Sequence, residues 1–157
     1  MLDATLKQTL SATLERLQRP VHLTAALDAS PAAAEMRALL ADIAEASPRV
    51  QITEGGPDQR QPSFAISDAA GHQAGLPPRV RFAGLPLGHE FTSLVLALLW
   101  AGGHPPKFEP AMIELIRALD ADLHFEVYMS LSCHNCPDVV QAVALMATLN
   151  PRIRATV

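Results

Sequence analysis

An internal repeat is the feature of this sequence that most limits the folds open to it. Residues 21–23 (VHL) resemble residues 123–125 (LHF) at an offset of 102 positions, and residues 48–53 resemble residues 151–156 at an offset of 103. Each match is short, but two matches with nearly the same offset and the same order of elements indicate a duplicated unit. The sequence therefore predicts two related lobes.

Hydrophobic spacing predicts the helices. Leucines at positions 2, 6, 10, 14 and 17 recur at the three- and four-residue intervals of an amphipathic helix, which Pro20 ends. Ser30 can cap a helix over residues 31–46. A nearly all-apolar helix is expected over residues 88–101, where two glycines stop it, and another begins at Pro110.

The expected strands decide the fold class. Residues 21–27 form a short apolar run, and residues 49–54, 63–68 and 79–84 carry hydrophobic side chains in strand-like patterns. A further strand is expected over residues 123–129. The order helix, β-α-β, then β-β-α is that of a thioredoxin-like sandwich, so the sequence predicts an α/β protein with tandem thioredoxin-like folds.

The two lobes are expected to differ in completeness. Residues 1–104 would form a complete thioredoxin-like lobe without cysteines, whereas residues 105–157 hold only the N-terminal β-α-β half of a second lobe. Nothing in the second lobe corresponds to residues 55–101 of the first. A lone pair of parallel strands would expose unpaired backbone edges, so we expect the chain to be a fragment of a longer protein.

Composition argues against several functional classes. The chain has 157 residues, is 49% hydrophobic and has a formal net charge of -4, and nucleic-acid binding usually needs a basic surface. The longest apolar run, residues 94–101, is far shorter than the roughly 20 residues of a membrane span. The N-terminal residues lack the pattern of a secretory signal. We expect a cytoplasmic protein that binds neither nucleic acid nor membranes.

Both cysteines lie in the motif Cys133-His134-Asn135-Cys136, directly after an expected strand and at the start of an expected helix. Pro137 suits the first turn of that helix. The inward face of the helix is expected to hold Val139, Val143, Met146 and Leu149.

This placement predicts redox chemistry. Free backbone N–H groups and the positive end of the helix dipole stabilise a thiolate, which is the attacking species in disulfide exchange. Cys133 is therefore the expected nucleophile, and Cys136, one turn further in, is positioned to resolve a mixed disulfide. His134 could add positive charge beside Cys133.

Two less favoured interpretations of the cysteine pair stay open. A zinc site needs four ligands, whereas this motif supplies two, and the histidines contain no pair at zinc-finger spacing. An inert buried pair would not need the adjacent strand, helix start and proline.

Two positions of the first lobe are further candidates. Glu90 is either an ordinary acidic residue at a helix N-terminus or a residue near the lobe interface that influences a thiol. Pro62 precedes the strand over residues 63–68, where thioredoxin-like folds carry a cis proline beside the redox site. An ordinary loop proline fits that position equally well.

Two long segments resemble a known family. Residues 81–100 (RFAGLPLGHEFTSLVLALLW) and 130–142 (SLSCHNCPDVVQA) closely resemble the N-terminal domain of the flavoprotein subunit of alkyl hydroperoxide reductase, and residues 150–153 also match. The resemblance covers the whole chain. It implies two fused thioredoxin-like folds, of which only the second carries the Cys-His-Asn-Cys motif.

The resemblance also implies a role as a tethered disulfide carrier. Electrons would pass from NADH to FAD, to a second dithiol in the flavoprotein body, to the pair matching Cys133 and Cys136, and then to the disulfide of a peroxiredoxin. Cys133 would be the interchange cysteine, Cys136 its resolving partner and Glu90 an acidic tuning residue. His134, Asn135 and Pro137 are expected to tune the pair as well. The full-length protein is expected to form a homodimer.

The flavin- and nicotinamide-binding body is missing from this sequence. Nothing in it resembles a G-x-G-x-x-G loop after a strand, so we expect the chain itself to bind no FAD, no NADH and no metal. As an oxidoreductase acting on disulfides, it would be incomplete alone. The alternatives are a catalytically silent interaction module and, less favoured, a zinc-binding module.

Overall fold

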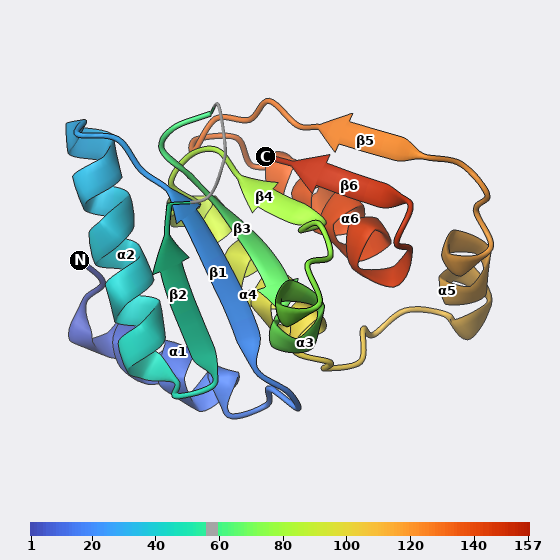
Figure 1. The fold of residues 1–157 in the computed structure, drawn as a ribbon, viewed down its shortest axis with the longest axis horizontal. Helices are drawn as coiled ribbons and strands as arrows, with labels where there is room; N and C mark the ends of the chain where they lie inside the picture. Colours follow the sequence, from blue (N-terminus) through green and yellow to red (C-terminus); the bar gives the residue numbers. More distant parts are fainter. Residues whose placement is uncertain (56–59) are drawn as a thin grey trace.

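The computed structural model describes residues 1–55 and 60–157, which form a six-stranded mixed sheet flanked by helices (Figure 1). The elements, in chain order, are α1 (Ala4–Leu14), β1 (Val21–Ala26), α2 (Pro31–Ala46), β2 (Val50–Glu54), β3 (Ser63–Asp68), α3 (Ala69–Gln73), β4 (Val80–Phe82), the 3-10 helix η1 (Gly88–Glu90), α4 (Phe91–Ala101), α5 (Pro110–Arg117), β5 (Leu123–Glu126), α6 (Cys136–Leu149) and β6 (Ile153–Thr156). The predicted α/β class is confirmed.

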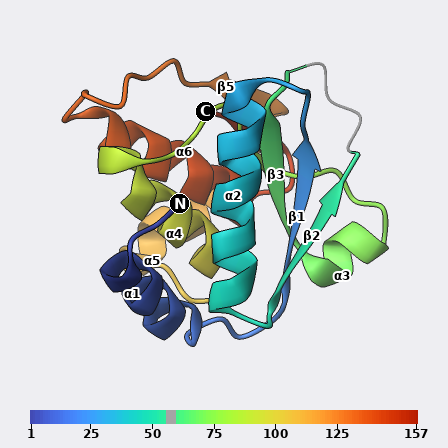
Figure 2. The same cartoon turned by 90° about the vertical axis from the view of Figure 1, so that its left-hand side faces the viewer.

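The helices are distributed unequally over the two faces of the sheet. Figure 2 shows α1, α2, α4 and α6 on one face and the short α3 on the other. Inward side chains of the strands pack against the larger helical layer in one hydrophobic core, which extends from Leu10 and Leu14 of α1 to Val140 and Ala144 of α6. Burial of these side chains holds both halves of the chain on the same sheet.

A parallel pairing between β4 and β6 makes the sheet continuous across the two expected lobes. The strand order is β2-β1-β3-β4-β6-β5, and Val80 lies opposite Ala155. The backbone N–H of Ala155 donates to the carbonyl oxygen of Arg79 at 2.8 Å, and that of Val157 donates to Arg81 at 2.9 Å. One edge of the second β-α-β unit is thereby paired. The lobe boundary after residue 104 stays a prediction.

The repeat is visible in the strand registers. In the first half Val21 of β1 lies opposite Val50 of β2, and in the second half Leu123 of β5 lies opposite Ile153 of β6. These pairs correspond at the offsets of 102 and 103 found in the sequence. Both pairs are parallel and joined through a helix, so the two β-α-β units share one geometry.

Helix α3 lies in the connection between β3 and β4, for which the sequence predicts no helix. Asp68 ends β3 and caps the helix, because its side chain accepts a hydrogen bond from the backbone N–H of Gly71 at 2.8 Å. One turn of helix therefore forms in a stretch too short to show a hydrophobic period.

The inward face of α6 differs by one residue from the expected one. Val143 is buried as predicted, but Val139 is 52% exposed and Val140 is fully buried in its place. The buried residues of the helix are Val140, Val143, Ala144, Leu145 and Ala147, and all of them except Leu145 follow one helical stripe. Small alanines complete this face, and a pattern based on large hydrophobic residues overlooks them.

The strand expected over residues 123–129 is shorter in the structure and ends at Glu126. The backbone N–H of Val127 still donates to Thr156 of β6 at 2.8 Å, but β6 itself ends at Thr156. Residues 127–130 therefore leave the sheet and lead to the cysteine motif.

Disruption of the β4–β6 ladder is expected to separate the two halves. Ala155→Pro removes the N–H that bonds to Arg79, and the free energy of unfolding should fall by about 2–4 kcal/mol in urea denaturation. Ala155→Gly keeps the N–H and serves as the control. Limited proteolysis should cleave the proline variant faster within residues 102–110; equal resistance would contradict the role given to this pairing.

A histidine pair links α3 to the sheet. The ring of His22, which is buried in β1, stacks on that of His72 in α3 with 3.5 Å between the ring centroids. Its Nε2 lies 2.9 Å from the hydroxyl of Thr53. Burial, and secondarily the neighbouring His72, lowers the pKa of His22. Neutral His22 is therefore the form that the fold favours.

The lowered pKa of His22 predicts a pH dependence of stability. Its contribution is present above the ordinary histidine pKa of about 6.5 and is lost as the pH falls through the lower folded value. Urea denaturation at about pH 7.5 and about pH 5 should show less acid destabilisation in His22→Gln than in the unmodified chain. His104→Gln, in the loop after α4, is the matched control. An equal loss in all three proteins would contradict this prediction.

Candidate redox site

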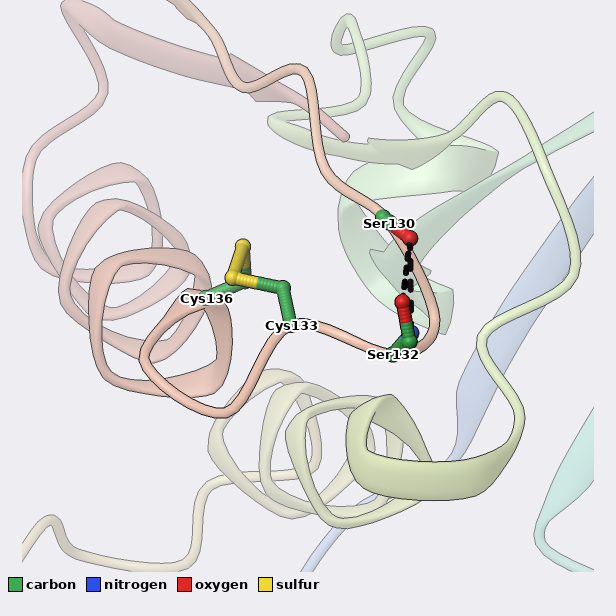
Figure 3. Close-up of a disulfide and its surroundings, with 4 residues drawn as sticks. All are labelled: Ser130, Ser132, Cys133 and Cys136. Atoms are coloured by element: carbon green, nitrogen blue, oxygen red, sulfur yellow. Dashed lines mark hydrogen bonds between the residues drawn. A yellow bond between two sulfur atoms is a disulfide. The ribbon is translucent and has the colours of Figure 1, made fainter.

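A disulfide joins Cys133 and Cys136 where the chain leaves β5 and enters α6, and Figure 3 shows it at the first turn of that helix. The two Cα atoms are 5.5 Å apart. Both cysteines are half-buried, whereas His134 and Asn135 between them are exposed. The sulfur pair is therefore held by the fold at a surface that another protein can reach.

Hydrogen bonds shape the loop before the first cysteine. The backbone N–H of Cys133 donates to the carbonyl oxygen of Ser130 at 2.9 Å, which closes a turn. The hydroxyl oxygens of Ser130 and Ser132 are 3.0 Å apart, as the dashed line between them in Figure 3 indicates. This turn fixes the direction in which Cys133 approaches α6.

The start of α6 suits a negative charge on sulfur. Asn135 occupies the N-cap position, yet its side chain makes no capping hydrogen bond within the described residues, and Pro137 lies in the first turn. Backbone N–H groups of that turn thus remain available to a neighbouring anion. Asp138, in the same turn, is the opposing negative charge.

Glu90 lies in the first-lobe segment that approaches this loop. Its side chain is 0% exposed, and both carboxylate oxygens lack a hydrogen-bond partner among residues 1–55 and 60–157. A buried carboxylate without partners is costly in its ionised form. Glu90 is also the N-cap residue of α4, so its position at a helix N-terminus is as expected. Its effect on a thiol stays a prediction.

The backbone beside Glu90 comes close to the cysteine loop. Gly88 has a φ of 60°, in the left-handed region that favours glycine, and a Cβ built there would lie 3.8 Å from the carbonyl oxygen of Leu131. The ring of His89 contacts that of His134 at 4.8 Å between centroids. η1 and the redox loop are thus neighbours in the fold.

Pro62, the other first-lobe candidate, follows a cis peptide bond from Gln61. The sequence allows a cis proline at this position, and the structure has one. Two residues earlier, the guanidinium of Arg60 forms an ion pair at 2.5 Å with the carboxylate of Glu126 in the second half of the chain. The placement of Pro62 beside the redox site stays a prediction.

The pattern of the sequence does not reveal His89 as part of this region. His89 is exposed and belongs to no hydrophobic pattern. The ring that it contacts, His134, lies in the other half of the chain. The only signal for His89 is its position next to Glu90.

Residues 1–55 and 60–157 were compared with two geometric requirements, that of a metal-ligand cluster and that of a membrane-spanning helix. Within those ranges, no cluster of three or more histidine, cysteine, aspartate or glutamate side chains is arranged to hold a metal ion. No helix among the same residues is long and apolar enough to cross a membrane.

Comparison with known proteins gives a consistent result, although no family model matches the chain. The chain is 55% identical to the F subunit of alkyl hydroperoxide reductase of Escherichia coli strain K12 over 157 residues, which is 99% of this chain and 29% of that protein. It thus spans less than a third of the length of this curated relative.

Solved structures extend this similarity to the fold. The N-terminal domain of the corresponding reductase of Enterococcus faecalis superposes with a TM-score of 0.83 and is 30% identical, with coverage of 99% of this chain and 79% of that one. A protein disulfide oxidoreductase from Aeropyrum pernix has a TM-score of 0.76 at 22% identity, with coverage of 99% and 75%. The predicted thioredoxin-like fold is confirmed.

Replacement of Glu90 by an apolar residue is expected to stabilise the fold. Glu90→Leu removes a buried carboxyl group that lacks a partner among the described residues, so the free energy of unfolding should rise by about 1–3 kcal/mol in urea denaturation. Glu90→Gln keeps the shape and the polarity and is the control. A less stable leucine variant would show that the carboxyl group has a stabilising partner after all.

Proposed function

Because this chain belongs to the family of N-terminal domains of the alkyl hydroperoxide reductase flavoprotein, we propose that it carries electrons between a reductase and a partner disulfide through Cys133 and Cys136. The observation that carries this proposal is the half-exposed disulfide at the uncapped N-terminus of α6. It makes the chain a component of a disulfide oxidoreductase.

The exchange follows from the placement of the two sulfurs. A dithiol donor supplies two electrons, its own thiols become a disulfide, and the Cys133–Cys136 bond opens. The thiolate of Cys133 then attacks one sulfur of the partner disulfide and releases the other sulfur as a thiolate, which takes a proton from solvent. Cys136 attacks Cys133 in turn, which restores the intramolecular disulfide and frees the partner as a dithiol.

The first turn of α6 supports the assignment of Cys133 as the nucleophile. The N–H groups of this turn and the helix dipole favour negative charge before Cys136, which is the position of Cys133. His134, Asn135 and Pro137 set the charge, exposure and backbone geometry of this turn. Glu90 would tune the pair from the buried side.

The partners follow from the family. We assign the acceptor disulfide to the peroxiredoxin subunit of alkyl hydroperoxide reductase, whose reduction supports peroxide detoxification. The donor dithiol belongs to the flavoprotein body of the enzyme, which uses FAD and NADH. The glycines of this chain form no dinucleotide-binding loop of the G-x-G-x-x-G type, so flavin chemistry has no step on it. The cytoplasm is the compartment in which this pair would be regenerated.

A reconstituted exchange tests this function. The 157-residue chain, mixed with the flavoprotein body, NADH and oxidised peroxiredoxin, should support NADH consumption. Cys133→Ser should lower that rate by about a hundredfold or more, because a hydroxyl cannot replace the attacking thiolate. A serine variant as fast as the unmodified chain would contradict the proposal.

A second variant identifies the attacking sulfur. Cys136→Ser should trap a mixed disulfide between Cys133 and the peroxiredoxin, which mass spectrometry would detect. If the unmodified chain binds the peroxiredoxin without exchange, it is a silent interaction module.

A further inference from the structure

The ring contact between His89 and His134 joins the first lobe to the segment between the two sulfurs. The ring planes are inclined at 61°, in an edge-to-face arrangement, and the centroids are 4.8 Å apart. Both side chains are exposed, so burial does not force them together. The contact must instead follow from how the two backbones are held.

The backbone on the His89 side is fixed by its neighbours. Gly88 turns in the left-handed region and lies close to the carbonyl oxygen of Leu131, while the N–H of Glu90 donates to the carbonyl oxygen of Leu87 at 3.1 Å. The side chain of Glu90 is fully buried. His89 is therefore placed between two anchored residues.

The backbone on the His134 side is held by α6 and by the turn before Cys133. The backbone N–H of Cys133 donates to the carbonyl oxygen of Ser130 at 2.9 Å. Helix α6 is tied to α4 by the hydrogen bond from Nε2 of Gln141 to the hydroxyl of Ser93 at 3.3 Å. Since α4 directly follows η1, both imidazoles are carried by elements that are fixed relative to each other.

The edge-to-face arrangement suits a positive charge on one of the two rings. Asp138 lies in the first turn of α6, and the sulfur of Cys133 becomes an anion on reduction. These groups attract a positive charge. Two imidazolium rings in contact would repel each other, whereas the edge of a cationic ring on the face of a neutral ring is favourable.

We propose that His89 is a positioning residue for the disulfide exchange: its ring holds the ring of His134 in place next to Cys133. This inference deepens the proposed function and rests on it. His89 acts through His134 and not on the sulfur itself.

The positive charge serves the reduced state. When a donor dithiol reduces the disulfide, it becomes a disulfide itself and gives up two electrons and two protons. One proton goes to Cys136 and the other to solvent, which leaves Cys133 as a thiolate. A cation held next to Cys133 stabilises that thiolate and makes it the more reactive of the two sulfurs.

The pH dependence of alkylation tests this role in the full chain. With Cys136→Ser as the common background, iodoacetamide reports the thiolate of Cys133 alone. His89→Ala should lower its alkylation rate at about pH 6 by about two- to fivefold and move the pH profile upward. His89→Phe keeps an aromatic face for His134 without a second ionisable ring, so its profile should match that of the background protein.

The matched control is His104→Ala, which removes a histidine from the loop after α4 and should leave the profile unchanged. An unchanged profile in His89→Ala, or an equal defect in His89→Phe, would overturn the proposal. The alkylation assay needs no partner protein. Failure of the unmodified chain to reduce a peroxiredoxin would therefore overturn the proposed function, whereas the alkylation profiles would still decide the role of His89.

Discussion

The parallel pairing of β4 with β6 is the interaction on which the rest of the structure depends. It consists of a few backbone hydrogen bonds, among them those from Ala155 to Arg79 and from Val157 to Arg81. Through it the second β-α-β unit shares one sheet and one hydrophobic core with the first lobe. Together with the packing of α6 against α4, it fixes the cysteines of α6 relative to η1.

That fixed relation brings together features that would be unfavourable in isolation. A carboxyl group without partners among the described residues is buried at Glu90, and α6 begins without a side-chain cap at Asn135. Each costs stability, because each leaves polar groups without a partner among the described residues. Such local costs at a site of chemistry are typical of proteins whose remaining structure compensates for them.

The sequence predicts well what depends on local pattern. The helices over residues 31–46 and 88–101, the strand over residues 63–68 and the helix start at the cysteine motif follow from hydrophobic period, capping and proline placement. The sequence does not predict contacts between distant segments. The β4–β6 pairing, the burial of Glu90 and the ring contact of His89 all depend on how the two halves dock, and no local period encodes that docking. The prediction for the face of α6 is wrong at Val139 because alanine, although buried on the true face, is a weak hydrophobic signal.

The duplication also places one polar pair in two surroundings. In the first half His22 bonds to Thr53 under the cover of α3, and in the second half His124 lies 3.0 Å from Thr156 on an exposed strand. A single molecule thus contains a shielded and an open copy of the same imidazole–hydroxyl contact, with equivalent strand registers beneath both. The NMR signals of the two imidazole rings can be followed in one sample. Because both rings have the same hydroxyl neighbour, a difference between their signals would report the effect of shielding from solvent.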